Sequence, residues 1–196
     1  MKKKIIITGG LGYIGTELCK LYSGLSWHHE IIVIDNRFIS ERVNQIRNWN
    51  MKFIQGDILD NDLIEKYCKD ADIVHHLAGI TDVPRTQSEA SKLQDAKIQE
   101  VGEKGTQNIL NVISDKCKII FPSTHVVFEG INEVKTDIEE NENLKPVLSY
   151  STSKAINEKQ LKKSGKNYVI LRLGSVYGYS TDSMRIDIMP NLFSKI

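Results

Sequence analysis

The sequence predicts a doubly wound α/β protein with a parallel sheet. Short apolar runs alternate with stretches of helical spacing along the chain. The runs are continuously apolar, which is typical of strands that are covered on both faces. The expected strands are Ile5–Thr8, Ile31–Ile34, Lys52–Ile54, Ile73–His76, Lys118–Phe121 and Tyr168–Leu173, and the expected helices are 13–24, 60–68, 90–114 and 150–164.

Composition excludes several classes of partner. The 196 residues suit one well-cored domain, and 26 basic against 25 acidic residues give no charge excess for nucleic acid or a membrane surface. No apolar run approaches the roughly 20 residues that span a bilayer. Three cysteines (Cys19, Cys68 and Cys117) without C-x-x-C spacing indicate reduced, buried thiols in a cytoplasmic protein. The polar stretch 132–145 is expected to be a surface excursion.

The segment that follows the first strand is rich in glycine. Gly9, Gly12 and Gly15 stand between the strand Ile5–Thr8 and a helical pattern. Glycine lets the main chain approach a ligand closely, and the following helix directs unpaired N–H groups and a positive dipole end at the turn. A plain strand–helix turn is the alternative, but this context and spacing favour a pyrophosphate site.

The second expected strand ends at an acidic residue. Asp35 lies 20 residues after Gly15, where a carboxylate can hydrogen-bond the adenosine ribose of a dinucleotide. Such a carboxylate repels a 2′-phosphate, so NAD is favoured over NADP, and Arg37 could soften that preference. A polar residue that merely ends a strand is the alternative for Asp35.

Two further strand ends belong to the same sheet edge. The segments Gly56–Ile58 and His75–Gly79 follow the third and fourth strands, and ligands of open α/β sheets bind at that edge. Successive strand residues point to opposite faces, so His75 and His76 cannot hold one metal ion together. No metal site is expected.

Tyr150 and Lys154 are spaced to share one face of a helix. If that face meets the cofactor, the ammonium lowers the pKa of the phenol, and the phenolate can act as a base near neutral pH. A hydroxyl of Thr124 or Ser123 could share the proton of the substrate. A surface helix pair is the alternative interpretation.

Taken together, these segments resemble the extended short-chain dehydrogenase/reductase family, in particular its NAD-dependent nucleotide-sugar epimerases and dehydratases. The similarity follows the order of the family's motifs and spans nearly the whole chain. The matching segments are TGGLGYIG (8–15), VIDN (33–36), GDI (56–58), HLAG (76–79), GTQNIL (105–110), PSTHVVF (122–128), YSTSKAINE (150–158) and LRLGSVYG (171–178).

The resemblance implies a role for each matched residue. Tyr150 would be the base, Lys154 would tune it and bind the nicotinamide ribose, and Thr124 would hydrogen-bond a sugar hydroxyl. The implied NAD-binding residues are Gly9, Gly12, Tyr13, Ile14 and Gly15 at the pyrophosphate, Asp35 and Asn36 at the adenosine ribose, Asp57 and Ile58 at the adenine, and Leu77, Ala78 and Gly79 on the path to the nicotinamide.

The sequence departs from the family's pattern at three sites. Gly102 and Ser175 stand where the family usually has asparagine. The residue pair that follows Thr124 is His125-Val126, whereas sugar 4,6-dehydratases carry Asp-Glu there, which argues against dehydration. His125 is expected to be structural, with an acid or base role as the alternative.

Family members usually continue for more than a hundred residues into a domain that binds the substrate. We therefore expect residues 1–178 to be the NAD-binding domain and residues 179–196 to begin a truncated substrate-binding region, so the chain is expected to be a fragment or a shortened gene product. The resemblance also implies a homodimer through helices 90–114 and 150–164. Their apolar positions could equally face the sheet; these are Ile98, Val101, Ile109, Leu110, Ile156 and Leu161.

The favoured hypothesis is an NAD-dependent nucleotide-sugar epimerase that acts by 4-epimerisation. One alternative is a sugar reductase or dehydrogenase that uses NAD(P) as a released co-substrate. Another is a non-catalytic dinucleotide-binding protein, suggested by Gly102 and the missing substrate domain; Tyr150 and Lys154 count against it.

Overall fold

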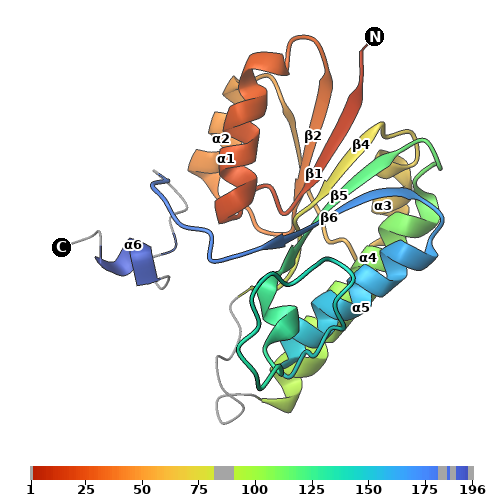
Figure 1. Cartoon of the computed structure of the whole chain (residues 1–196). Helices are drawn as coiled ribbons and strands as arrows, with labels where there is room; N and C mark the ends of the chain where they lie inside the picture. Colours follow the sequence, from red (N-terminus) through yellow and green to blue (C-terminus); the bar gives the residue numbers. More distant parts are fainter. Residues whose placement is uncertain (1, 82–90, 181–184, 186–188, 194–196) are drawn as a thin grey trace.

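The structure, a computed structural model, describes residues 2–81, 91–180, 185 and 189–193. Within them six parallel strands form one sheet in the order β3-β2-β1-β4-β5-β6, which confirms the expected fold class (Figure 1). The elements are β1 (Lys4–Thr8), α1 (Tyr13–Tyr22), η1 (Ser23–Leu25), β2 (Glu30–Asp35), α2 (Ser40–Asn48), β3 (Lys52–Gln55), α3 (Asn61–Cys68), β4 (Ile73–His76), α4 (Lys92–Val112), β5 (Lys118–Thr124), η3 (His125–Phe128), α5 (Ser149–Lys163), β6 (Asn167–Leu173) and α6 (Met189–Phe193).

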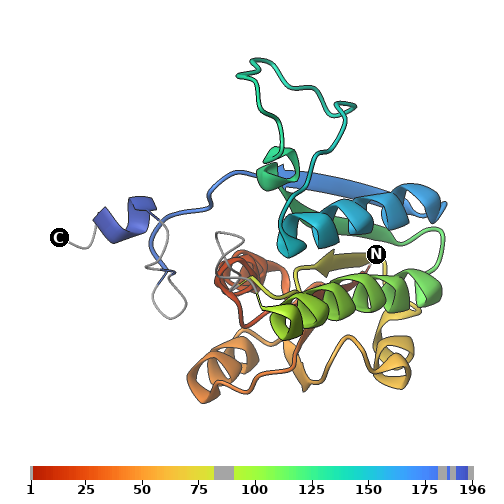
Figure 2. The same cartoon turned by 90° about the horizontal axis from the view of Figure 1, so that it is seen from below.

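Helices cover both faces of the sheet. Helices α1 and α2 pack on one face, and α3, α4 and α5 on the other (Figures 1 and 2). Alternation along β1 divides its side chains between two cores: Ile5 and Ile7 join the cluster under α1 and α2, and Ile6 joins the cluster under the other three helices. This double burial explains why β1 and β2 are continuous apolar runs.

All six expected strands are present; β4 has the expected bounds, and the ends of the other five differ from the expected ends by at most three residues. Helix α2 was not predicted from the sequence. Its nine residues bury only Val43 and Ile46, one turn apart, and the rest of SERVNQIRN is polar or charged. Two apolar positions are too few for a helical period to be recognised in the sequence. The short helix η3 was not predicted either.

The paired histidines of β4 point to opposite faces, as expected. The ring of His75 makes a 2.8 Å hydrogen bond with the hydroxyl of Tyr22 on the α1 side. The ring of His76, on the other side, bridges the hydroxyls of Thr8 at 2.9 Å and Thr106 at 3.0 Å. Burial lowers the pKa of His76 to about 3, assisted by the charge of Lys154, so this ring is neutral at physiological pH.

The burial of the cysteines and the surface excursion that the sequence predicts are both found in the part of the chain that the structure describes. Cys19, Cys68 and Cys117 are free thiols and all three are buried. Residues 132–145 form an irregular excursion that extends away from the sheet, and Val134 within it is fully exposed (Figure 2). Among the described residues, no helix has the length and apolar character that crossing a membrane requires.

The first turn of α1 lies against the end of β1 without any intervening side chain. A Cβ on Gly15 would lie 2.3 Å from the carbonyl oxygen of Gly9 and 2.7 Å from the Cα of Gly10. Gly9 has φ +70°, and a Cβ there would lie 2.7 Å from the backbone nitrogen of Ala78. These obstacles are backbone atoms, so no rotamer change relieves them.

We expect Gly15→Ala to lower the free energy of unfolding by about 1–3 kcal/mol, because the methyl group pushes α1 away from the glycine turn. Gly24→Ala is the matched control, because a Cβ at Gly24 meets nothing within 4 Å. Urea unfolding followed by circular dichroism measures both variants. Equal stability of the two variants would contradict this account of the turn.

Candidate functional site

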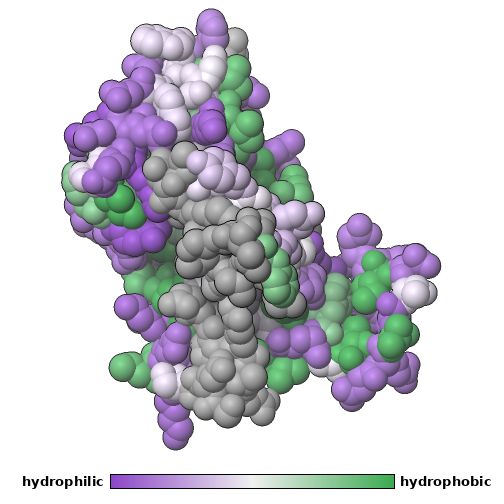
Figure 3. Space-filling view, turned by 90° about the vertical axis from the view of Figure 1, so that its left-hand side faces the viewer, coloured by the Kyte–Doolittle hydropathy of each residue, from purple (hydrophilic) through white to green (hydrophobic). Residues whose placement is uncertain are grey.

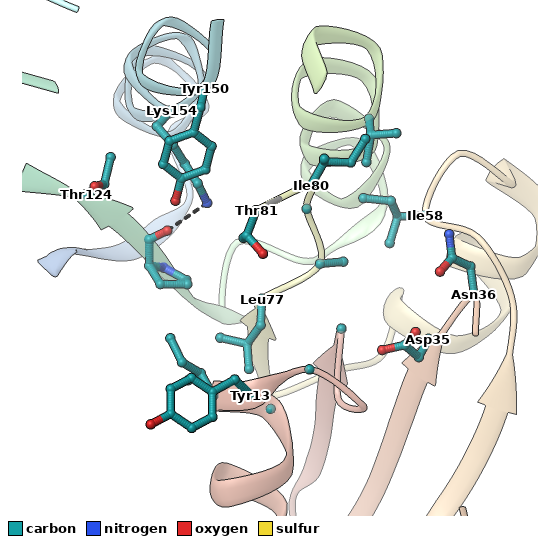
Figure 4. Close-up of a pocket in the computed structure, with 18 of the residues that line it drawn as sticks. Tyr13, Asp35, Asn36, Ile58, Leu77, Ile80, Thr81, Thr124, Tyr150 and Lys154 are labelled. Atoms are coloured by element: carbon teal, nitrogen blue, oxygen red, sulfur yellow. Dashed lines mark hydrogen bonds between the residues drawn. The ribbon is translucent and has the colours of Figure 1, made fainter. Parts of the chain in front are cut away.

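A pocket of about 840 Å³ opens at the carboxyl ends of the strands. Every residue that the sequence analysis assigned to the cofactor or to catalysis lines it. Figure 4 shows the arrangement: Asp35 and Asn36 lie at one end, Leu77 lies in the middle, and Tyr150, Lys154 and Thr124 lie at the other end. The elongated order of these residues suits an elongated ligand.

The glycine turn offers main chain to an anion. Helix α1 begins after Gly12, has no side-chain cap at its N-terminus and has no acidic residue in its first turn. Its first N–H groups therefore face the pocket without a competing carboxylate, which is the arrangement that binds phosphate. The hydroxyl of Tyr13 donates to the carbonyl of Gly178 at 2.5 Å, so this side chain ties the segment after β6 to the turn.

Asp35 ends β2, as predicted, and its carboxylate is buried. One carboxylate oxygen accepts from the backbone N–H of Leu11 at 2.9 Å, and the other accepts from the backbone N–H of Arg37 at 3.0 Å. Beside it the amide of Asn36 donates to Asp57 at 3.3 Å. These bonds bring the ends of β2 and β3 together with the glycine turn.

Tyr150 and Lys154 lie one turn apart on α5 and both face the pocket (Figure 4). The ammonium of Lys154 donates to the carbonyl of Pro122 on β5 at 2.9 Å and lies 4.4 Å from the centroid of the Phe121 ring. Thr124 ends β5, and its buried hydroxyl accepts from the backbone N–H of Val126 at 3.3 Å. Strand β5 and helix α5 thus bring the three predicted catalytic residues together.

The expectation that Lys154 lowers the pKa of Tyr150 is wrong for this structure. Burial is the dominant influence and raises the pKa of the Tyr150 phenol, and the cation that partly opposes it is Arg185. Lys154 itself is desolvated, which lowers its pKa to about 8. Its ammonium lies 5.9 Å from the centroid of the Tyr150 ring and is turned toward Pro122.

Glu129 fixes the start of α5, and no sequence motif indicated this role. Its carboxylate accepts from the backbone N–H groups of Val147 and Leu148 at 2.7 Å each, and from the hydroxyl of Ser151. Burial raises the pKa of Glu129, but these hydrogen bonds outweigh burial and the pKa falls below its usual value. The carboxylate thereby caps the helix that presents Tyr150.

The three departures from the family pattern have different structural contexts. A Cβ on Gly102 would lie 2.1 Å from the hydroxyl of Ser153, so glycine permits the close approach of α4 and α5. Ser175 lines the pocket. The ring of His125 contacts the carbonyl of Leu173 at 3.2 Å, and His125 is not among the residues that line the described pocket.

The pocket contains further residues that the sequence analysis did not assign. Arg185 lies close enough to Tyr150 to influence its pKa and donates to the carbonyl of Thr81 at 3.4 Å. Lys97 and Val101, four residues apart on α4, also line the pocket. The four-residue spacing of Lys97 and Val101 predicts that they share one face of a helix. Nothing in the sequence around Arg185 indicates its position beside Tyr150.

A doubly wound sheet, an uncapped glycine turn, a carboxylate that ends β2 and a tyrosine–lysine pair beside β5 define a dinucleotide-binding protein of the short-chain dehydrogenase/reductase type. The model of the NAD dependent epimerase/dehydratase family matches residues 5–196. The chain belongs to this NAD-dependent family.

Curated relatives and solved structures agree with this assignment. A putative UDP-glucose 4-epimerase of Methanocaldococcus jannaschii is 33% identical over 187 residues, which cover 91% of this chain and 57% of that protein. A dTDP-D-glucose 4,6-dehydratase of Dictyostelium discoideum is 29% identical over 197 residues, covering 90% of this chain and 44% of the relative. The chain thus spans about half the length of these relatives.

Among solved structures, a UDP-glucuronic acid 4-epimerase from Bacillus cereus in complex with NAD has a TM-score of 0.76 at 26% identity, covering 98% of this chain and 61% of that one. A UDP-N-acetylglucosamine 4-epimerase from Methanobrevibacter ruminantium M1, in complex with UDP-N-acetylmuramic acid, has a TM-score of 0.73 at 28% identity. The match covers 99% of this chain and 63% of that one. Both support the fold over nearly the whole chain.

The buried ammonium of Lys154 is expected to reduce the stability of the fold. Its pKa is near 8 in the folded state and about 10.5 in the unfolded state. The cost is therefore complete below pH 8 and disappears as the pH rises toward 10.5. We expect Lys154→Met to raise the free energy of unfolding by about 1–3 kcal/mol at pH 7, with a smaller gain at pH 10.

Urea unfolding at both pH values measures this gain. Lys163→Met is the control, because Lys163 is exposed on the same helix. A Lys154→Met variant that is no more stable than the parent at pH 7 would contradict a net cost of burying this ammonium beside Pro122 and Phe121.

Proposed function

We propose that the chain forms the NAD-binding and catalytic part of a nucleotide-sugar 4-epimerase. The observation that carries the proposal is the position of Tyr150, Lys154 and Thr124 at the end of the pocket opposite Asp35. A dinucleotide held by Asp35 and the glycine turn would extend from one end to the other. Its nicotinamide would then lie beside the tyrosine.

The residues present fit NAD. The uncapped N-terminus of α1 and the close-packed glycines would take the pyrophosphate, and the Asp35 carboxylate would take the adenosine ribose. Ile58 would pack beside the adenine, and Leu77 would lie on the path to the nicotinamide. Bound NAD⁺ would supply the hydride acceptor and a positive ring charge that favours the phenolate of Tyr150.

In the proposed reaction Tyr150 removes the proton of the sugar 4-hydroxyl as the carbon loses hydride. Thr124 donates a hydrogen bond to the same oxygen, and Lys154 orients the nicotinamide ribose. The resulting 4-keto sugar would rotate within the site. Hydride would then return to the opposite face of the same carbon while Tyr150 gives the proton back. The proton is thus conserved over a cycle, and no net NADH accumulates.

Burial keeps the phenol of Tyr150 protonated at neutral pH in the isolated chain, because burial raises its pKa. The base form needs nearby positive charge, and Arg185 supplies part of it. We therefore propose that Arg185, at the side of the pocket near Tyr150, assists the proton transfer.

Chemistry beside Thr124 favours epimerisation over dehydration. Elimination of water requires an acid and a base in addition to the tyrosine. The residue after Thr124 is His125, which contacts Leu173 and does not line the described pocket, and Val126 has no ionisable group. The similarity to a putative UDP-glucose 4-epimerase, at 33% identity over 187 residues, supports the same reaction class.

We further propose that residues 1–178 form the NAD-binding domain and that residues 179–196 begin the substrate-binding region of a longer protein. The last strand ends at Leu173, and residues 181–184, 186–188 and 194–196 lie outside the described residues. The half-length match to relatives supports a fragment.

A homodimer through α4 and α5 is also proposed. The two helices pack side by side, with the amide of Gln160 donating to the carbonyl of Glu103 at 3.1 Å. Ile98, Ile109, Leu110 and Leu161 are buried inside the protomer, so for them the sheet-facing alternative is correct. An interface would therefore use the outer, mostly polar surface of the pair. Sedimentation velocity at micromolar concentration tests the proposal.

The epimerase proposal predicts that the protein purifies with bound NAD and interconverts UDP-glucose and UDP-galactose, or their N-acetyl forms, without consuming added cofactor. Tyr150→Phe should lower kcat by at least 10²-fold because it removes the proton acceptor, while NAD binding changes less than threefold. Chromatography of the nucleotide sugars and isothermal titration with NAD provide the two measurements.

Stoichiometric oxidation of NADH would identify a reductase instead. Failure to bind any nicotinamide dinucleotide would overturn the proposal altogether. Tyr177→Phe serves as the control, because Tyr177 is an exposed tyrosine that does not line the pocket.

A further inference from the structure

One buried carboxylate has no role in the proposed reaction. Glu158 lies on α5, one turn after Lys154 and two turns after Tyr150, and only 1% of it is exposed. Its first carboxylate oxygen accepts from the Ser123 hydroxyl at 2.6 Å and from Nε of Arg172 at 3.0 Å. Its second accepts from Nη2 of Arg172 at 2.8 Å. Every polar atom of this side chain is thus engaged.

These bonds join α5 to two neighbouring strands at one level. Ser123 of β5 and Arg172 of β6 are direct partners in the parallel ladder, and both reach the same carboxylate. Arg172 also donates to the carbonyl of Glu140 at 3.1 Å and lies 5.1 Å from the centroid of the Phe128 ring. The cluster of Glu158, Ser123 and Arg172 therefore connects α5, β5, β6, η3 and the surface excursion.

The cluster contacts β5 next to the residues that the proposed catalytic groups contact. Ser123 stands between Pro122, whose carbonyl accepts the Lys154 ammonium, and Thr124. Any movement of α5 relative to Ser123 therefore changes the distance from Lys154 to Pro122 and from Tyr150 to Thr124. Misplacement of reacting groups by about 1 Å can reduce a rate by about 10²-fold.

Stability alone does not account for this cluster. Removing two charges from water is costly, and well-packed apolar replacements of a buried ion pair are often neutral or stabilising. Directional bonds among α5, β5 and β6 fix the distance between the helix and the strands, which apolar packing does not.

We propose that Glu158, held by Ser123 and Arg172, is a positioning residue that sets the separation between Tyr150 and Lys154 on α5 and Thr124 on β5. The effect of Glu158 on the reaction rate rests on the proposed function. The effect of Glu158 on the position of Lys154 does not. The chain's own lysine thus provides a readout that needs no substrate.

The test compares three variants of the intact protein. Glu158→Met/Arg172→Met replaces the ion pair by apolar side chains and leaves the net charge unchanged. Ser123→Ala is the milder variant and removes the hydrogen bond from β5; because Ser123 also lines the pocket, the pKa of Lys154 is the decisive readout for this variant. Leu161→Ala, on the same helix and fully buried, is the control that weakens packing but leaves the cluster intact. Thermal unfolding establishes that each variant folds and how much stability it has lost.

Nuclear magnetic resonance of the lysine side chains follows the pKa of Lys154, which burial lowers to about 8. We expect the double variant and Ser123→Ala to raise it by at least half a unit, because a looser contact with β5 admits water. We expect Leu161→Ala to change it by less than 0.2 units. With UDP-glucose as the probe, the first two variants should lose 10- to 100-fold in kcat, with KM changed less than threefold.

An unchanged Lys154 pKa in both cluster variants would overturn the proposal. So would equal changes in Leu161→Ala, since these would reduce the cluster to ordinary packing. A third outcome separates the two proposals. If the Lys154 pKa rises in the cluster variants but the parent protein epimerises neither UDP-glucose nor UDP-N-acetylglucosamine, the positioning role is supported and the proposed function is not.

Discussion

The close approach of backbone to backbone at the glycine turn is the constraint on which the pocket depends. The carbonyl of Gly9 occupies the space that a side chain at residue 15 would need, and the backbone of Ala78 occupies the corresponding space at residue 9. The turn therefore lies directly on the end of β4. This contact brings the N-terminus of α1 and the Leu77–Gly79 segment to the same pocket, and the carboxyl ends of the other strands complete its wall.

Most of the fold could be predicted because burial on both faces imposes continuous apolar runs on the strands. Helix α2 could not, because it buries only Val43 and Ile46 and is otherwise polar. The carboxyl end of a strand can also be predicted from sequence when a polar residue or a glycine-containing segment follows the apolar run. Asp35, Thr124 and the Leu77–Gly79 segment each follow or end an apolar run, and this placed them at the correct edge of the sheet.

Contacts between distant segments were less accessible from sequence. Glu129 caps α5 from 18 residues before Val147, and Arg185 lies beside Tyr150 although 35 positions separate them. Neither residue belongs to a local pattern. The pKa of Tyr150 failed to follow the sequence-based expectation for the same reason, since burial by the whole fold raises it and the cation that opposes this is the distant Arg185.

Asp35 has two duties that the fold does not separate. Its carboxylate holds the backbone N–H of Leu11 inside the glycine turn and that of Arg37 just beyond β2, in addition to facing the pocket. Replacing Asp35 to redesign cofactor preference would therefore also release the glycine turn that is proposed to bind the pyrophosphate. Arg37, whose side chain is more than half exposed, also donates through its Nε to the Asp35 carboxylate at 3.3 Å, so a change at residue 37 acts on the same carboxylate.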